Sequence, residues 1–248
     1  MDTPDWVAGF FDDGFEETFR RLGKYDTTDQ DVDILLTLVP LPAGVRILDV
    51  PCGWGRGAGR LDALGYRVDG VDISEHQIRC ARDRWPQVRF HHADMRTPPA
   101  GPFDAIVNLW TSFGTLPTSA DDESALHAWR QVLTPGGALV MELTTFENAH
   151  ATNNTGDPVT GTKTVVVNGV REDAVFDWEH AISTNTYTRG EWSRTCVTHL
   201  YTRVQLHDML VRNRFRDITM YGGFSGTDVR DDRRTVIVAR LTPLREGE

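Results

Sequence analysis

The sequence is poor in lysine and in long apolar runs, and each shortage excludes a class of partner. Of its 26 basic residues only Lys24 and Lys163 are lysine, and the net charge is −10. An acidic chain without a clustered basic run is not expected to bind a phosphate backbone, so nucleic acid is not a predicted partner. No apolar run approaches the roughly eighteen residues that a membrane span needs, so no membrane partner is predicted.

The chain has three cysteines, which are widely spaced and form no CxxC pair. This pattern indicates reduced thiols in a cytosol. The acidic N-terminus also lacks the basic and apolar segments of a signal peptide. We therefore expect a cytoplasmic protein.

Residues 45–74 carry the strongest local pattern. Their apolar, β-branched start predicts a buried parallel strand, and Pro51 ends it because proline cannot donate to a central ladder. Gly53 and Gly55 then allow a tight turn and the close approach of a ligand. A helical segment and a second apolar strand that ends in Asp72 complete a nucleotide-binding βαβ unit.

Two classes of cofactor fit this unit. Gly53, Gly55 and Ala58, with Asp72 about twenty residues further on, suit a dinucleotide dehydrogenase. A dinucleotide, however, places its pyrophosphate at the helix N-terminus, where the carboxylate of Asp49 would be unfavourable. An acid there suits a ligand with a positive charge and no phosphate, such as S-adenosylmethionine. Asp72 can bind the ribose hydroxyls in either case, so Asp49 favours S-adenosylmethionine.

Further motifs follow in order along the chain: HHADM at 91–95, FDAIVNLWTSFG at 103–114 and LTPGG at 133–137. Together with LDVPCGWGR at 48–56, they resemble the class I S-adenosylmethionine-dependent methyltransferases, in particular a bacterial group that acts on small molecules. The resemblance covers nearly the whole chain. It implies an α/β, Rossmann-like fold with a mostly parallel seven-stranded sheet and an antiparallel last strand. It also implies S-adenosylmethionine as cofactor and S-adenosylhomocysteine as product.

The resemblance gives individual residues their roles. Asp94 is expected to accept a hydrogen bond from the adenine amino group, and Met95 to flank the ring. The adjacent His91 and His92 would point to opposite faces of a strand, and no cluster of acids resembles the magnesium site of catechol-type O-methyltransferases, so no metal is predicted. The predicted cofactor-binding residues are Asp49, Cys52, Gly53, Gly55, Asp72, Ile73, Asp94, Met95, Asn108 and Trp110.

The chain is predicted to have four parts. These are an N-terminal helical lid (1–40), a cofactor-binding core (41–150), an antiparallel β insert (151–202) and a C-terminal completion of the core sheet (203–248). Alternating residues predict the insert, with hairpin turns at 168–169 and 189–190. In the resembled family such an insert roofs the pocket and selects the substrate, and its many aromatic side chains favour an aromatic or partly apolar acceptor.

The predicted function is S-adenosylmethionine-dependent methylation of a small molecule, with oxygen, nitrogen or carbon open as the acceptor atom and the oligomeric state also open. Tyr25 in the lid, Trp110, and His150 in the loop after the fifth strand are predicted to shape or deprotonate the acceptor. Trp110 and Phe113 could hold the sulfonium by cation–π attraction. The alternatives are a non-methylating reaction such as cyclisation, a non-catalytic binding protein and a dehydrogenase.

Overall fold

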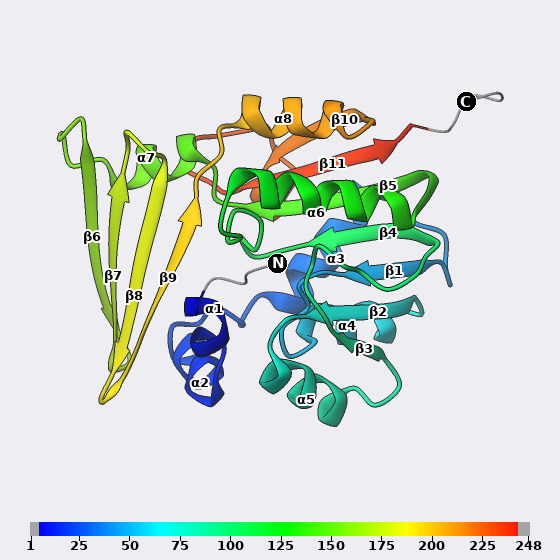
Figure 1. Ribbon diagram of the computed structural model, residues 1–248, viewed down its shortest axis with the longest axis horizontal. Helices are drawn as coiled ribbons and strands as arrows, with labels where there is room; N and C mark the ends of the chain where they lie inside the picture. Colours follow the sequence, from blue (N-terminus) through cyan, green and yellow to red (C-terminus); the bar gives the residue numbers. More distant parts are fainter. Residues whose placement is uncertain (1–4, 243–248) are drawn as a thin grey trace.

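The computed structural model describes residues 5–242, whose strands form two sheets (Figure 1). The main sheet has seven strands in the order β10-β11-β5-β4-β1-β2-β3. The strands β1 to β5 are parallel, whereas β11 runs antiparallel to both of its neighbours. The predicted fold class is therefore confirmed. The strands are β1 (Arg46–Asp49), β2 (Arg67–Asp72), β3 (Arg89–His92), β4 (Phe103–Asn108), β5 (Leu133–Leu143), β10 (Phe215–Gly222) and β11 (Thr235–Leu241).

Helices cover both faces of the main sheet, because its central strands are apolar on both sides. Helices α3 (Thr28–Leu38), α4 (Arg56–Ala63) and α5 (Glu75–Arg84) pack their buried residues against one face. Helices α6 (Ser119–Val132) and α8 (Arg203–Arg212) pack against the other face. The parallel strands end on the side of the molecule where the second sheet stands, so ligands are expected at that side (Figure 1).

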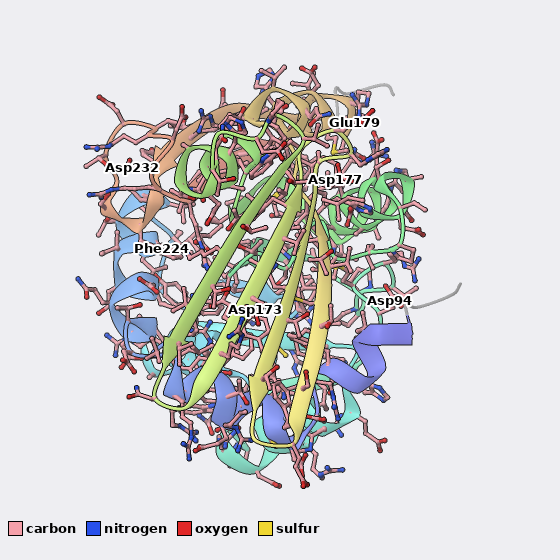
Figure 2. All side chains as sticks on the ribbon, turned by 90° about the vertical axis from the view of Figure 1, so that its left-hand side faces the viewer. Asp94, Asp173, Asp177, Glu179, Phe224 and Asp232 are labelled. Carbon is pink, nitrogen blue, oxygen red and sulfur yellow. The ribbon has the colours of Figure 1, made fainter. Side chains whose placement is uncertain are left out.

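The second sheet is the predicted insert, with the antiparallel order β6-β7-β8-β9. Figure 2 looks at its outer face, where Asp173 lies in β7 and Asp177 at the end of that strand. Asn168 and Gly169 both have a positive φ, 48° and 76°, and form the β6–β7 hairpin turn as predicted. The turn after β8 begins at Gly190, one residue later than predicted. The strands are β6 (Thr160–Val167), β7 (Val170–Asp177), β8 (Ile182–Arg189) and β9 (Trp192–His199).

Two short helices, α1 (Asp5–Phe10) and α2 (Asp13–Arg21), join the two sheets. Asp12 caps α2 by accepting from the amide of Gly14 at 2.9 Å, and its carboxylate also accepts from Nε1 of Trp192 in β9 at 2.9 Å. On the other side, the hydroxyl of Ser74 donates to the carbonyl of Phe11 at 3.0 Å. The N-terminal helices are thus fixed to the insert and to the start of α5. Within residues 5–242, no helix has the length and apolar character that crossing a membrane requires.

Candidate functional site

The site is centred on Asp49, which ends β1. Its side chain is fully buried, and neither carboxylate oxygen has a hydrogen-bond partner among the described residues. Burial raises the pKa of Asp49 to about 7, although the guanidinium of Arg56 and the amide of Ala58 act in the opposite direction. The carboxylate lies below the first turn of α4, since a Cβ on Gly57 would be 3.1 Å from its Oδ2. A buried carboxyl group without a hydrogen-bond partner is complementary to a cationic group.

A glycine turn joins Asp49 to α4 and is held by Asp72. Gly53 and Gly55 adopt φ angles of 54° and 81°, a conformation that favours glycine. Oδ2 of Asp72 accepts from the amide of Gly53 at 2.8 Å, and Oδ1 accepts from the amide of Ser74 at 2.8 Å. Burial raises the pKa of Asp72 to about 6. Each carboxylate oxygen can accept a second hydrogen bond, so Asp72 can hold the turn and bind a hydroxyl at the same time.

Two other predicted residues surround this turn. Cys52 is buried, and burial raises the pKa of its thiol well above the ordinary value, so it is a packing residue and not a nucleophile. Nδ2 of Asn108 donates to the carbonyl of Val50 at 2.7 Å, which ties the end of β4 to the turn. Its Oδ1 is buried without a partner in the described part of the chain. Ile73 follows Asp72 and is half-buried, and its carbonyl contacts Nε2 of His92 at 2.9 Å.

Asp94 and Met95 lie in the loop after β3, and their side chains are half-buried. Both oxygens of Asp94 accept from the guanidinium of Arg96, at 3.0 and 2.7 Å. The carbonyl of Met95 accepts from Nε1 of the buried Trp129 at 2.9 Å. This loop is therefore rigidly positioned, and the ionic partner of Asp94 was not predicted. The contact between Asp94 and adenine stays a prediction.

The segment after β4 forms an unusual turn at Trp110 and Thr111, which both have a φ of 59°. Non-glycine residues rarely adopt this conformation, which costs free energy. Glu142 at the end of β5 compensates: its Oε2 accepts from the amide of Trp110 at 2.8 Å and its carbonyl accepts from the amide of Thr111 at 2.9 Å. Arg234 lies 3.3 Å from Oε1 of Glu142. Neither Glu142 nor Arg234 was predicted to belong to the site.

Arg56 joins this turn to the N-terminal segment. Its guanidinium carbon lies 3.3 Å from the ring centroid of Trp110 and 4.9 Å from that of Tyr25. One nitrogen donates to Oγ1 of Thr28 at 2.6 Å. Tyr25 and Trp110 thus both contact Arg56, a residue for which no role was predicted. Burial raises the pKa of Tyr25 well above its ordinary value, so the hydroxyl stays protonated at neutral pH.

The third predicted catalytic residue, His150, lies elsewhere. It belongs to α7 (Phe146–Asn153), so its placement in a loop was wrong. Its ring stacks on Phe146 with 5.8 Å between centroids and meets the edge of Trp178 at 5.0 Å. Its Nε2 contacts Nδ2 of Asn154 at 2.9 Å. These contacts belong to the packing between α7 and the insert, and they do not bring His150 to Arg56.

Aromatic residues of the core and of the insert have structural partners. Phe113 is buried in the core, where it packs against Trp129 with 6.1 Å between ring centroids. The hydroxyl of Tyr201 donates to the buried Asp122 at 2.7 Å. In the insert, the hydroxyl of Tyr187 donates to the carboxylate of the half-buried Glu172 at 3.2 Å. No group of three or more His, Cys, Asp or Glu side chains that could hold a metal occurs in the described part of the chain.

Comparison with known proteins shows similarity to methyltransferases over part of the chain. A profile described as "Methyltransferase domain" matches residues 47–137. The chain is 32% identical over 102 residues to the dTDP-3-amino-3,4,6-trideoxy-α-D-glucopyranose N,N-dimethyltransferase of Streptomyces venezuelae, covering 41% of this chain and 43% of that protein. It is 34% identical over 113 residues to the trans-aconitate 2-methyltransferase of Variovorax paradoxus, covering 44% and 42%. The chain spans about two-fifths of the length of these curated relatives.

Solved structures are similar over most of the chain. An S-adenosylmethionine-dependent methyltransferase from Clostridium acetobutylicum has a TM-score of 0.76 at 14% identity, covering 92% of this chain and 98% of that one. At this identity the likeness concerns the fold alone. The SAM-bound structure of CalS10, an amino pentose methyltransferase from Micromonospora echinaspora, has a TM-score of 0.69 at 25% identity, covering 93% and 98%.

Proposed function

We propose that this chain, which resembles the class I S-adenosylmethionine-dependent methyltransferases, transfers a methyl group from S-adenosylmethionine to a small molecule. The observation that carries this proposal is the buried carboxylate of Asp49, whose two oxygens have no partner within residues 5–242. A buried charge is costly unless it is paired, so the site is complementary to a cationic group. The same carboxylate beside the N-terminus of α4 disfavours the pyrophosphate of a dinucleotide.

The surrounding residues fit the rest of this cofactor. Asp49 would bind its ammonium group, Asp72 its ribose hydroxyls, and Asp94 and Met95 its adenine. Of the remaining predicted contacts, Cys52, Gly53 and Gly55 lie in the turn between Asp49 and α4, and Ile73 follows Asp72. Asn108 ends β4 and Trp110 lies in the turn after it. Bound S-adenosylmethionine supplies an activated methyl group for an in-line displacement.

Trp110 and Tyr25 are proposed to position the acceptor. Holding two reactants in line can contribute roughly 7–11 kcal/mol to lowering a barrier, so a site without a catalytic dyad is chemically sufficient. The protonated hydroxyl of Tyr25 would donate a hydrogen bond to the acceptor and would not remove its proton. The assignment of His150 as a general base stays a prediction, and its contacts within the α7 packing do not support it.

The first proposed acceptor is an aromatic or partly apolar small molecule, which the rings of Trp110 and Tyr25 would contact. Nitrogen is a second candidate for the methylated atom, because the carboxylate of Glu172 lies on the same face of the insert as Tyr187 and 3.6 Å from Nζ of Lys24. A carboxylate that already pairs with an ammonium group would suit a protonated amine. Sugar N-methylation by the Streptomyces venezuelae relative agrees with this second candidate.

The test measures binding and turnover separately. Calorimetric titration with S-adenosylhomocysteine and with NAD should give binding of the first ligand alone. S-adenosylmethionine is then incubated with panels of phenolic compounds and of amino sugars, and S-adenosylhomocysteine and methylated products are detected together. S-adenosylhomocysteine should form with an acceptor of one panel, and binding of NAD alone would refute the proposal.

A reaction that consumes an acceptor without forming S-adenosylhomocysteine would favour the alternative, a non-methylating reaction such as cyclisation. Cofactor binding without turnover on either panel would favour a binding protein. Single-turnover measurements of the methyl-transfer rate in Trp110→Ala and His150→Ala then compare the roles of the two residues. Transfer should slow in the first variant and should be unaffected in the second.

A further inference from the structure

A ligand with an amino-acid moiety needs two opposite charges from its site. The ammonium and carboxylate groups of S-adenosylmethionine are attached to one carbon atom, so their protein partners must lie close together. Asp49 offers the negative partner, buried below the first turn of α4. Arg56 opens that helix, and its guanidinium packs on the ring of Trp110. A Cβ on Gly57 would be 3.1 Å from that ring and 3.1 Å from Oδ2 of Asp49, so the two charged groups flank the same turn.

Arg56 differs from the next arginine of its helix in forming no ion pair with a carboxylate within residues 5–242. Its hydrogen bond among the described residues is to the neutral hydroxyl of Thr28. Arg60, one turn further along α4, forms an ion pair with both oxygens of Asp33, each 2.7 Å from the same nitrogen. A guanidinium has five N–H donors, and the bond to Thr28 uses one of them. The remaining donors of Arg56 can form the paired bonds that a carboxylate prefers.

Three contacts hold the guanidinium of Arg56 in position. Its carbon lies 3.3 Å from the centroid of Trp110 and 4.9 Å from that of Tyr25, and Thr28 holds one nitrogen at 2.6 Å. Contacts through the faces of a guanidinium leave its edge available for hydrogen bonds. Preorganisation of this kind lowers the entropic cost of binding a planar carboxylate.

From this geometry we propose that Arg56 binds the α-carboxylate of S-adenosylmethionine, next to the ammonium group held by Asp49. The assignment rests on the proposed function and adds a specific residue to it. Trp110 and Tyr25 act here as positioning residues, because they hold the guanidinium and do not themselves contact the carboxylate.

The test compares ligands that differ in the amino-acid moiety. Calorimetry is performed with S-adenosylhomocysteine, with its analogue that lacks only the carboxylate, and with 5′-methylthioadenosine, which lacks the amino-acid moiety. Arg56→Ala should weaken binding of S-adenosylhomocysteine by roughly tenfold to hundredfold, the effect of losing a charge-assisted pair. Binding of 5′-methylthioadenosine should be unchanged. Arg56→Lys should restore part of the loss, because it keeps the charge and loses the fork.

The matched control is Arg60→Ala, which removes an arginine from the same helix and should leave all three affinities unchanged. The wild-type protein gives a second test that does not depend on the folding of a variant. Its affinity for the analogue without the carboxylate should be lower than that for S-adenosylhomocysteine by the same factor. An equal loss of affinity for all three ligands in Arg56→Ala, or no loss of affinity for any of them, would overturn the assignment. If the wild-type protein binds none of the three, the proposed function fails; if it binds S-adenosylhomocysteine and its decarboxylated analogue equally, only the role of Arg56 fails.

Discussion

Replacing Asp49 with asparagine is expected to stabilise the ligand-free protein above pH 7 and to weaken its binding of S-adenosylhomocysteine. The two effects have one cause. The carboxylate is buried without a hydrogen-bond partner among the described residues, and the charge of Arg56 only partly offsets the effect of burial, so its ionisation opposes folding. Asparagine has nearly the same size and stays neutral at every pH. It therefore removes both the cost in the free protein and the attraction for the ligand.

The magnitude follows from the two pKa values of Asp49. The ordinary value is 3.8, whereas the folded protein raises the pKa to about 7. Between these values the unfolded chain has released the proton and the folded protein still holds it, so the wild-type protein loses stability as the pH rises from about 4 to about 7. Above pH 7 the loss is complete and the curve levels. The difference between the two pKa values corresponds to about 4 kcal/mol, an upper limit for one buried group.

Urea unfolding of the wild type and of Asp49→Asn across pH 4 to 8 measures this effect as a difference between two pH profiles. Asp83→Asn is the control, since it removes the same charge from an exposed position. The stability of Asp49→Asn relative to wild type should increase through the range from pH 4 to 7, and that of the control should not. Calorimetry at pH 8 should show roughly tenfold to hundredfold weaker binding of S-adenosylhomocysteine by Asp49→Asn. Parallel profiles for Asp49→Asn and wild type would refute the reasoning.

Two further substitutions test the supports around the site. Glu142→Ala leaves the amide of Trp110 without its acceptor and Arg234 without its carboxylate, so urea unfolding should show a loss of about 1–3 kcal/mol; a variant as stable as wild type would contradict this. Tyr201→Phe removes a hydroxyl that donates to the buried Asp122, which should cost about 2 kcal/mol in the same measurement, whereas an unchanged midpoint would show that the carboxylate finds another donor.

The cofactor half of the site could be predicted from the sequence because its geometry is local. Pro51 marks the end of β1, and the glycines after it predict the turn that the structure contains. Asp72 lies at the end of the next strand, so the right-handed βαβ connection brings it back to the same edge of the sheet as Asp49. Its bond to the amide of Gly53 is a direct consequence.

The acceptor half could not be predicted in the same way, since its contacts join residues far apart in the chain. Arg234 and Glu142 are 92 positions apart, and no spacing rule connects them. Their pairing depends on β11 lying against β5 in the antiparallel register that places Val236 opposite Glu142. The contact between Trp192 and Asp12 spans 180 positions and likewise depends on how the insert meets the N-terminal helices.

His150 illustrates a local error with a local cause. His150 was placed in the loop after the fifth strand, next to the segment 151–159, whose asparagine, threonine, glycine and proline residues favour a loop. The structure begins a helix there because the side chain of Thr145 accepts from the amide of Asn148, and because Phe146 packs against Trp178 with 5.8 Å between ring centroids. Tertiary packing of the aromatic ring therefore outweighs the weak helix propensity of the segment.

Arg56 connects segments that are far apart in the chain. The same guanidinium contacts Tyr25 from the N-terminal segment and Trp110 from the turn after β4, while its own helix begins beside Asp49. Glu142 fixes that turn through the amide of Trp110. A ligand that pairs with Arg56 therefore acts on a group to which three distant segments are already bound. Loss of that pairing should therefore change the position of the turn that carries Trp110 as well as weaken the binding of the cofactor.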